Sequence, residues 1–239
     1  IDRCQYYAKK CGIEFSEQDN NLSIALGGLS DGVTLKTLTN AYLPFVNNGY
    51  YKKSSFVSKI LDENGFPIYV NNYLQTKVFR DDTAYLITDM LKESTKIGTA
   101  KVLSDCEYDV ASKTGTNTVL GKNIDAYNVS YTTNDIIGVW IGNIDNSEIQ
   151  CVGGGLPSRI TKEYFKKIYK DKKPEQFKMP NSCVYIDIDT KELKENHLVV
   201  RANKFSPDRY RQKALFSKFN LPKETSNKNI SIVCPTITG

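Results

Sequence analysis

Four consecutive residues, Lys113, Thr114, Gly115 and Thr116, place a cation, two hydroxyl groups and a glycine next to one another. An ammonium group and hydroxyl donors both bind carboxylates, and glycine lets another backbone come close because it has no side chain. A ligand with an extended backbone and a carboxylate would use all of these features. The stretch is therefore the candidate binding site of the chain.

The same stretch has the composition of a strand at the edge of a sheet. Threonine is β-branched and favours extended backbone. Alternation along a strand puts Lys113 and Gly115 on one face and Thr114 and Thr116 on the other. The competing interpretation is a polar strand end with a solvated lysine, and four residues alone do not separate the two.

Other residues with chemical potential have simpler interpretations. Trp140 stands in an apolar strand, which predicts packing in the core. His197 stands in a polar segment and is not expected to be catalytic. Asp125 is expected to make a structural hydrogen bond near the sheet edge. The glycines at 153–155 are not followed by Gly-Lys-Ser/Thr, so they predict a turn into a helix and not a phosphate loop.

The six cysteines do not form a recognisable framework. They contain no Cys-x-x-Cys pair, and the single histidine has no cysteine near it in sequence, so no zinc module is predicted. Cys4 and Cys11 are two helical turns apart, about 10 Å, which is too far for a disulfide. Free, partly buried thiols are expected at Cys4, Cys11, Cys106, Cys151, Cys183 and Cys234.

The composition describes an ordinary globular protein. The 239 residues are 40% hydrophobic and 25% charged, with a formal net charge of +5. Such a mild excess of positive charge does not argue for nucleic acid as a partner. The longest apolar run, near Ile136–Ile144, is interrupted and too short to span a bilayer. The chain opens at Ile1, within a predicted helix, and is expected to be part of a longer polypeptide.

Turn residues and apolar spacing predict the elements that precede the candidate strand. The first elements are a helix over 1–11, an extended segment over 22–28, and a helix begun by Thr34 and kinked or ended by Pro44. A strand over 55–61, a hairpin turn at Asn64-Gly65, a return strand over 66–70 and an extended segment over 76–79 follow. The last element is a helix begun by Asp81 or Asp82, and the residues expected on its buried side are Ala84, Tyr85, Ile87, Thr88 and Leu91.

A central antiparallel sheet is predicted next, because three strands follow one another through short connections. The expected strands are 110–116, 125–131 and 136–144, with a polar loop over 117–123 and a turn over 132–135. A helix capped by Ser158 follows, with Ile160, Tyr164, Phe165 and Ile168 on its apolar face. A sheet flanked by helices is an α+β fold.

The remaining chain is predicted to be an extension. Residues 171–182 are interpreted as a linker, and 184–189 alternate as one half-buried strand. From about Asn203 the chain is basic. The two interpretations left open are a solvated tail on the surface and a contact to anionic wall polymer or lipid headgroups.

Several stretches together resemble the transpeptidase domain of class A penicillin-binding proteins. The resemblance extends from about residue 10 to about residue 170. It is carried by Ser23–Thr34, Ala41–Phe45, Thr83–Leu91, Lys113–Thr116, Asp125–Tyr127 and Gly138–Gly142, and Phe205–Arg209 is also similar.

The resemblance implies a five-stranded antiparallel sheet between helical layers, the fold shared with serine β-lactamases. It assigns residues 1–170 to the C-terminal part of a transpeptidase domain and 183–239 to an extension with one strand and a basic tail. The family's chemistry uses Ser-x-x-Lys, Ser-x-Asn and Lys-Thr-Gly. The first two do not occur in this sequence, so they are expected upstream of Ile1.

The resemblance also assigns roles to residues of the candidate strand. Lys113 would steer the donor's carboxylate, the hydroxyls of Thr114 and Thr116 would bind it, and the N–H of Thr116 would contribute to the oxyanion hole. Gly115 would admit the substrate backbone, and Asn117 would line the acceptor side. The implied ligands are peptidoglycan stem peptides ending in D-Ala-D-Ala, and β-lactams, with no cofactor or metal.

Three functions remain open on the sequence alone. The first is part of a serine DD-transpeptidase, inactive by itself and outside the cytoplasm, anchored to the membrane through a segment absent from this chain. The second is a non-catalytic module that binds stem peptides or β-lactams. The third is a basic interaction domain, in which Lys113–Thr116 is accidental.

Overall fold

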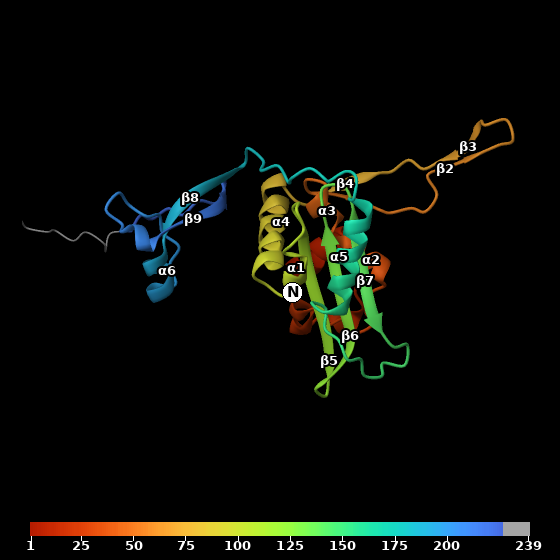
Figure 1. Cartoon of the computed structure of the whole chain (residues 1–239), viewed down its shortest axis with the longest axis horizontal. Helices are drawn as coiled ribbons and strands as arrows, with labels where there is room; N and C mark the ends of the chain where they lie inside the picture. Colours follow the sequence, from red (N-terminus) through yellow and green to blue (C-terminus); the bar gives the residue numbers. More distant parts are fainter. Residues whose placement is uncertain (227–239) are drawn as a thin grey trace, which may run out of the picture. The chain divides into compact units, whose positions relative to one another are not determined.

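A computed structural model of the protein describes residues 1–226 (Figure 1). The chain divides into two compact units, residues 1–178 and the residues from Met179 onward. Each unit is described by itself. The basic tail beyond Ser226, with Cys234, lies outside the described residues.

The N-terminal unit is built around an antiparallel sheet of three strands in the order β5-β6-β7. The strands are β5 (Ala111–Val119), β6 (Lys122–Tyr131) and β7 (Ile136–Gly142). The described residues thus give this sheet three strands and not the five that the resemblance implies. The polar loop predicted over 117–123 is wrong, because β5 and β6 continue into a tight turn at Leu120 and Gly121, both with positive φ.

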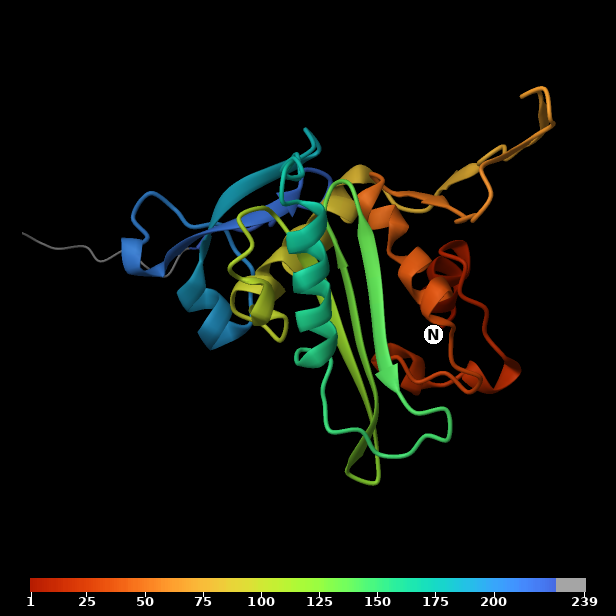
Figure 2. The ribbon, with the colours of Figure 1, turned by 45° about the vertical axis from the view of Figure 1, so that its right-hand side comes forward.

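Helices cover both faces of this sheet, which gives the expected α+β architecture (Figure 2). On one face α5 (Leu156–Ile168) lies against β6, and Thr161 bonds to the Asn128 side chain. On the other face α4 (Asp81–Lys96) bonds through Thr88 to the buried Tyr131 hydroxyl, at 3.0 Å. The sheet is therefore the middle layer of three.

The main apolar cluster lies where α5 meets the segment that leads into β5. It contains Ala100, Leu103, Val110, Phe165 and Tyr169, and all five are buried. Burial of this apolar surface is the main stabilising contribution that fixes the start of β5.

The helix prediction for α5 was right in position but wrong in two details. Gly155 precedes the first helical residue, while Ser158 lies in the first turn, where it is buried and donates to Gly153 O at 2.7 Å. Of the predicted apolar face only Phe165 is buried. Ile160 and Tyr164 are 43% and 48% exposed, because the sheet is met by the small polar side chains of the neighbouring helix face.

The start of α4 also differs from the prediction. Arg80 is the cap residue, and Asp81 and Asp82 occupy the first helical turn, where negative charge favours a helix. Asp82 is buried and accepts two hydrogen bonds from the Arg80 guanidinium. Ala84 and Thr88 are buried as expected.

The first 50 residues form short helices. The predicted Thr34 cap is confirmed, since its hydroxyl accepts from Thr37 N at 3.1 Å. The extended segment predicted over 22–28 is wrong: Asn21 caps a 3₁₀ turn there, and Gly27 ends it with φ +86°. The elements are α1 (Asp2–Lys10), η1 (Glu17–Asp19), η2 (Leu22–Leu26), α2 (Leu35–Ala41) and α3 (Leu43–Val46).

Two small strand pairs lie between α3 and α4, and a 3₁₀ turn follows α4. The predicted Asn64-Gly65 hairpin is confirmed, with Gly65 at φ +83°. Its first strand is shorter than the predicted 55–61. The pairs are β1 (Tyr50–Lys52) with β4 (Gln75–Lys77) and β2 (Lys59–Leu61) with β3 (Pro67–Val70), and the turn is η3 (Lys101–Leu103).

The C-terminal unit contains two strands where one was predicted. The expected strand is β8 (Cys183–Asp189), and it pairs antiparallel with β9 (Arg211–Ser217). Of the basic residues for which a solvated tail or a contact to an anionic polymer or lipid is predicted, Arg211 lies within β9, and its guanidinium is 3.3 Å from the Asp187 carboxylate of β8. The unit also contains α6 (Thr190–Asn196) and η4 (Asp208–Tyr210).

Candidate active site

The candidate stretch lies in β5, which is an edge strand of the three-stranded sheet as predicted. One side of β5 pairs with β6, with Lys113 opposite Val129 and Gly115 opposite Tyr127. The beginning of the other side is covered by α4, because Ser94 Oγ donates to Ser112 O and Thr95 Oγ1 donates to Val110 O. These bonds secure the strand just before the candidate residues.

The side of β5 away from β6 carries the main-chain groups of alternate residues. The carbonyls of Ser112 and Thr114 point to this side, since they accept from Ser94 and from Lys113 Nζ. In an antiparallel ladder the N–H and C=O of one residue point the same way, and the direction repeats every second residue. The N–H of Thr116 therefore points away from β6 as well.

Lys113 places its positive charge at this margin of the sheet. Its side chain is exposed, and Nζ donates to Thr114 O at 2.7 Å. An ammonium group has three protons to donate, so two remain for a ligand. The contact brings the charge back to the strand edge, although the lysine side chain starts from the face opposite the threonines.

The hydroxyl groups of Thr114 and Thr116 each have one partner within the unit. Thr114 Oγ1 lies 2.6 Å from Thr99 Oγ1, in the segment after α4. Thr116 Oγ1 accepts from Gly153 N at 3.1 Å. A hydroxyl has one proton and two lone pairs, so Thr116 keeps its proton available.

Gly115 is not required by the packing of this chain. A Cβ built there would lie 3.5 Å from Tyr127 Cβ, an ordinary contact, and Gly115 is not among the glycines with positive φ. The packing of the chain therefore gives no reason for a glycine at this position, and its predicted role toward a ligand backbone stays a prediction.

Gly153, in contrast, is required by the packing. A Cβ at this position would lie 2.4 Å from Tyr127 O and 2.5 Å from Gly115 O. The glycine turn into α5 thus lies directly on the β5–β6 ladder. The triple glycine predicted a helix entry, and this is confirmed. Its contact with Thr116 and the part played by Thr99 were missed, since neither has a local signal.

Asn117, predicted to bind substrate, is engaged with a neighbouring strand. Its amide donates to Asp125 Oδ2 at 3.1 Å, and the indole of Trp140 donates to Asp125 Oδ1 at 2.8 Å. The structural hydrogen bond expected for Asp125 is confirmed. The prediction that Trp140 packs in the core is wrong, because it is 38% exposed and lies across the sheet from Asn117.

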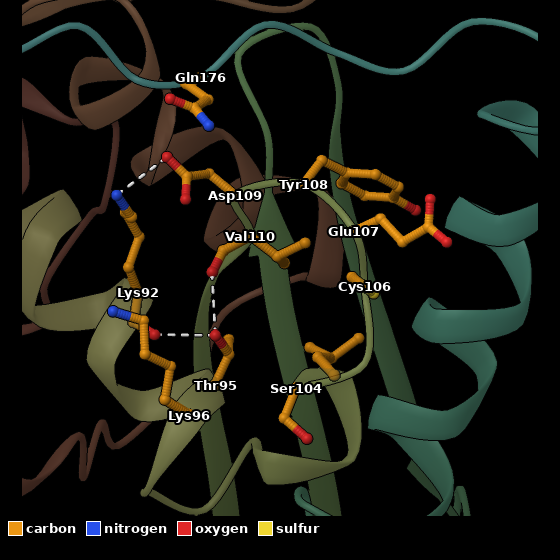
Figure 3. Close-up of a pocket in the computed structure, with 11 residues that line it drawn as sticks. Lys92, Thr95, Lys96, Ser104, Cys106, Glu107, Tyr108, Asp109, Val110 and Gln176 are labelled. Carbon is orange, nitrogen blue, oxygen red and sulfur yellow. Dashed lines mark hydrogen bonds and ion pairs between the residues drawn. The ribbon is translucent and has the colours of Figure 1, made fainter.

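A separate cavity of about 310 Å³ lies beside the segment that leads into β5 (Figure 3). The Lys92 ammonium pairs there with Asp109 at 2.9 Å, and Thr95 bonds to Val110 O. The residues that line the cavity include none of those predicted to bind ligand. Its contacts secure the start of β5.

Residues 1–226 contain neither a candidate metal site nor a helix that could span a membrane. Within that range no cluster of three or more histidine, cysteine or acidic side chains is arranged to hold a metal ion. The helices of the same range include none with the length and apolar character of a membrane span. His197 ends α6 in the C-terminal unit with φ +56°.

The chain was compared with known proteins. Residues 6–170 match the family model "Penicillin binding protein transpeptidase domain". Over 168 residues the chain is 34% identical to penicillin-binding protein 1F of Bacillus subtilis, covering 68% of this chain and 23% of that protein. The chain thus spans less than a quarter of that relative.

Solved structures give the same result for the fold. The structure of PonA1 from Mycobacterium tuberculosis in complex with penicillin V aligns with a TM-score of 0.62 and 25% identity, covering 73% of this chain and 51% of that one. Penicillin-binding protein 1A from Haemophilus influenzae aligns with a TM-score of 0.75 and 19% identity, covering 94% and 38%. The chain therefore belongs to the family of penicillin-binding protein transpeptidase domains.

Proposed function

We propose that this chain supplies the carboxylate-binding strand of a peptidoglycan DD-transpeptidase. The observation that carries the proposal is the placement of Lys113, Thr114 and Thr116 at the open margin of an edge strand. An extended peptide that ends in a carboxylate fits such a margin, because it gains main-chain hydrogen bonds and a charge partner together.

In the proposed reaction a serine hydroxyl attacks the carbonyl of the penultimate D-Ala of a stem peptide. The peptide bond breaks, the terminal D-Ala leaves with a proton on its nitrogen, and an acyl-enzyme remains. The amine of a second stem peptide then attacks the ester and releases the serine. A β-lactam enters the first step in the same way, but its leaving nitrogen stays attached to the acyl group.

Within this scheme each residue of the strand has a defined role. Lys113 and the hydroxyls of Thr114 and Thr116 bind the carboxylate, and Gly115 admits the ligand backbone. The Thr116 N–H is one oxyanion donor, and loss of such a donor costs about 3 kcal/mol of transition-state stabilisation. Asn117, held by Asp125, lines the side from which the acceptor amine arrives.

The nucleophile is proposed to come from an upstream part of the same polypeptide. The sequence contains no Ser-x-x-Lys and no Ser-x-Asn. On α5 an apolar stripe at four-residue spacing is exposed, and a companion segment packed there would bury it. Its members are Leu156, Ile160, Tyr164 and Ile168, at 48%, 43%, 48% and 37% exposure. Since peptidoglycan is assembled outside the cytoplasm, the proposed site of action is extracytoplasmic, with a membrane anchor in the same upstream part.

The missing motifs also favour a second candidate function. The chain would then hold stem peptides or β-lactams without reacting with them. The proposed enzyme part and this binding module differ in one measurement: only the first forms a covalent β-lactam adduct once the upstream motifs are supplied.

The test is labelling by a fluorescent penicillin of a polypeptide that joins Ser-x-x-Lys and Ser-x-Asn to this chain. Lys113→Ala should lower the labelling rate about a hundredfold, since a charge-assisted hydrogen bond to the carboxylate is lost. The matched control is Lys122→Ala, another exposed lysine of the β5–β6 hairpin, 66% exposed. Unchanged labelling in Lys113→Ala would support a basic interaction domain and overturn the proposal.

A further measurement uses the 239-residue chain alone. Incubation with benzylpenicillin followed by mass spectrometry should show no increase in mass. An increase equal to the mass of the drug would mean that this chain contains its own nucleophile.

A further inference from the structure

Beneath α5 the sheet carries a row of polar side chains where a protein core is usually apolar. Asn128 and Ser130 on β6 and Ser112 on β5 are fully buried, as are Ser158 and Thr161 on α5. A buried polar group is costly unless it is hydrogen-bonded. The side chains of this row must therefore form hydrogen bonds within the protein.

Asn128 satisfies its whole hydrogen-bonding capacity within this row. Its Nδ2 donates to Ser112 Oγ and to Ser158 Oγ, both at 2.9 Å. Its Oδ1 accepts from Ser130 Oγ at 2.7 Å and from Thr161 Oγ1 at 2.9 Å. A carboxamide has two donors and two acceptor positions, so the amide is held in one orientation.

From Asn128 the hydrogen bonds continue to the candidate site. Ser158 accepts from Asn128 and gives its single proton to Gly153 O at 2.7 Å. Gly153 N then donates to Thr116 Oγ1 at 3.1 Å. Ser158 thus holds Gly153 through its carbonyl, and Gly153 holds the Thr116 side chain through its N–H.

This path determines which hydrogen bond Thr116 can offer. Its Oγ1 already accepts from Gly153, so its proton is free to point to another acceptor, and the side chain is exposed. A ligand carboxylate only accepts hydrogen bonds. We propose that Ser158, anchored by Asn128, is a positioning residue that acts through Gly153 to hold the Thr116 hydroxyl as a donor to the ligand's carboxylate.

This inference rests on the proposed function, and its test separates the two. Replacing Asn128 would remove a hydrogen bond from four buried side chains at once. The informative variant is therefore Ser158→Ala, which removes the link to Gly153 and only one of the two acceptors of Asn128 Nδ2. The matched control is Thr132→Val. Thr132 directly follows β6 and is equally buried. Its hydroxyl accepts from Asn134 N and Asp135 N and is bonded to the Tyr169 hydroxyl, and none of these bonds involves Gly153.

The readout is the ratio of acylation rates for benzylpenicillin and its methyl ester, in the polypeptide that joins the upstream motifs to this chain. The parent should favour the free acid. Both Ser158→Ala and Thr116→Val should lower that preference about tenfold, the size expected for one charge-assisted hydrogen bond. The double variant should lower the preference for the free acid no more than Thr116→Val alone does. Thr132→Val should keep the preference within about twofold.

A second measurement does not depend on acylation. In the 239-residue chain, hydrogen exchange at the Gly153 amide should be faster in Ser158→Ala than in Thr132→Val. Equal exchange rates, or losses that multiply in the double variant, would overturn the positioning role and leave the proposed function intact. If the parent is not acylated, or Lys113→Ala does not affect it, the proposed function fails and the positioning role fails with it.

Discussion

Gly115 lies directly opposite Tyr127 in the β5–β6 ladder, and Gly153 lies on top of the same pair. The two glycines look alike in the sequence, but they face different constraints. At Gly115 a Cβ would make an ordinary contact at 3.5 Å, whereas at Gly153 it would lie within 2.5 Å of two carbonyl oxygens. The packing of the fold thus requires a glycine at position 153 but not at position 115.

Gly115→Ala should therefore leave the stability within about 1 kcal/mol of the parent. In the polypeptide that joins the upstream motifs to this chain, it should slow acylation by penicillin. Gly153→Ala should lower the free energy of unfolding by about 1–3 kcal/mol or more through overpacking. Urea unfolding and labelling rates check both variants. Normal acylation in Gly115→Ala would contradict the close approach of a ligand backbone.

Trp140, Asp125 and Asn117 form a chain of hydrogen bonds across the exposed end of the sheet. Asp125→Ala removes the acceptor of both neighbours, which should cost about 1 kcal/mol and loosen the indole. Because the chain has a single tryptophan, its emission maximum and its quenching by acrylamide report the change directly. Identical emission in Asp125→Ala and the parent would rule out this contact.

Cys11 is buried, and burial raises the pKa of its thiol to about 11 from its ordinary value of 9.0. The unfolded chain ionises at the lower pKa and the folded chain at the higher one. The stability should therefore be complete below pH 9 and decrease as the pH rises through 11. Cys11→Ala should have a flatter stability profile between pH 8 and 10.5, measured by urea unfolding.

The same burial predicts how the thiols react. At pH 8 the exposed Cys4 should react with a thiol reagent such as DTNB, whereas the buried Cys11 should react only after unfolding. Cys4, Cys11, Cys106 and Cys151 are free thiols, as predicted. Fast reaction of Cys11 in the native state would contradict the fold around the end of α1.

Asp19 secures the loop between η1 and α2. Its carboxylate accepts from Ser30 N at 2.7 Å and Ser16 N at 2.8 Å, and these main-chain donors lower its pKa. A lowered pKa stabilises the fold above the unfolded value, about 4, and this contribution disappears as the pH falls through the folded value.

Asp19→Asn should therefore lower the melting temperature at pH 7, and the difference from the parent should shrink toward pH 3. Asp31→Asn, an exposed carboxyl of the same loop, is the matched control and should not change the melting temperature. A difference that stays constant from pH 7 to pH 3 would exclude a contribution from the ionised Asp19.

Local chemistry was sufficient for several features of this protein. β-Branched threonines predicted the extended backbone of Lys113–Thr116, Asn64-Gly65 predicted a hairpin, and Thr34 predicted a helix cap. Each depends on a few adjacent residues, because turn geometry, capping and strand propensity act over one turn or one strand. The motif order along the chain was also sufficient to predict the family.

Only the tertiary structure determined the partners of the candidate residues. Thr99 and Gly153 lie 15 and 37 residues from the threonines that they contact, and no spacing rule connects them. The face of α5 that is buried contains Ser158 and Thr161, because both form hydrogen bonds with Asn128. These bonds outweighed the apolar periodicity of the helix. The basic residues of β9 adopt a strand because they pair with β8 through main-chain hydrogen bonds and because Asp187 of β8 carries the opposite charge. Interactions of this kind are formed between segments far apart in sequence, so they exist only once the chain has folded.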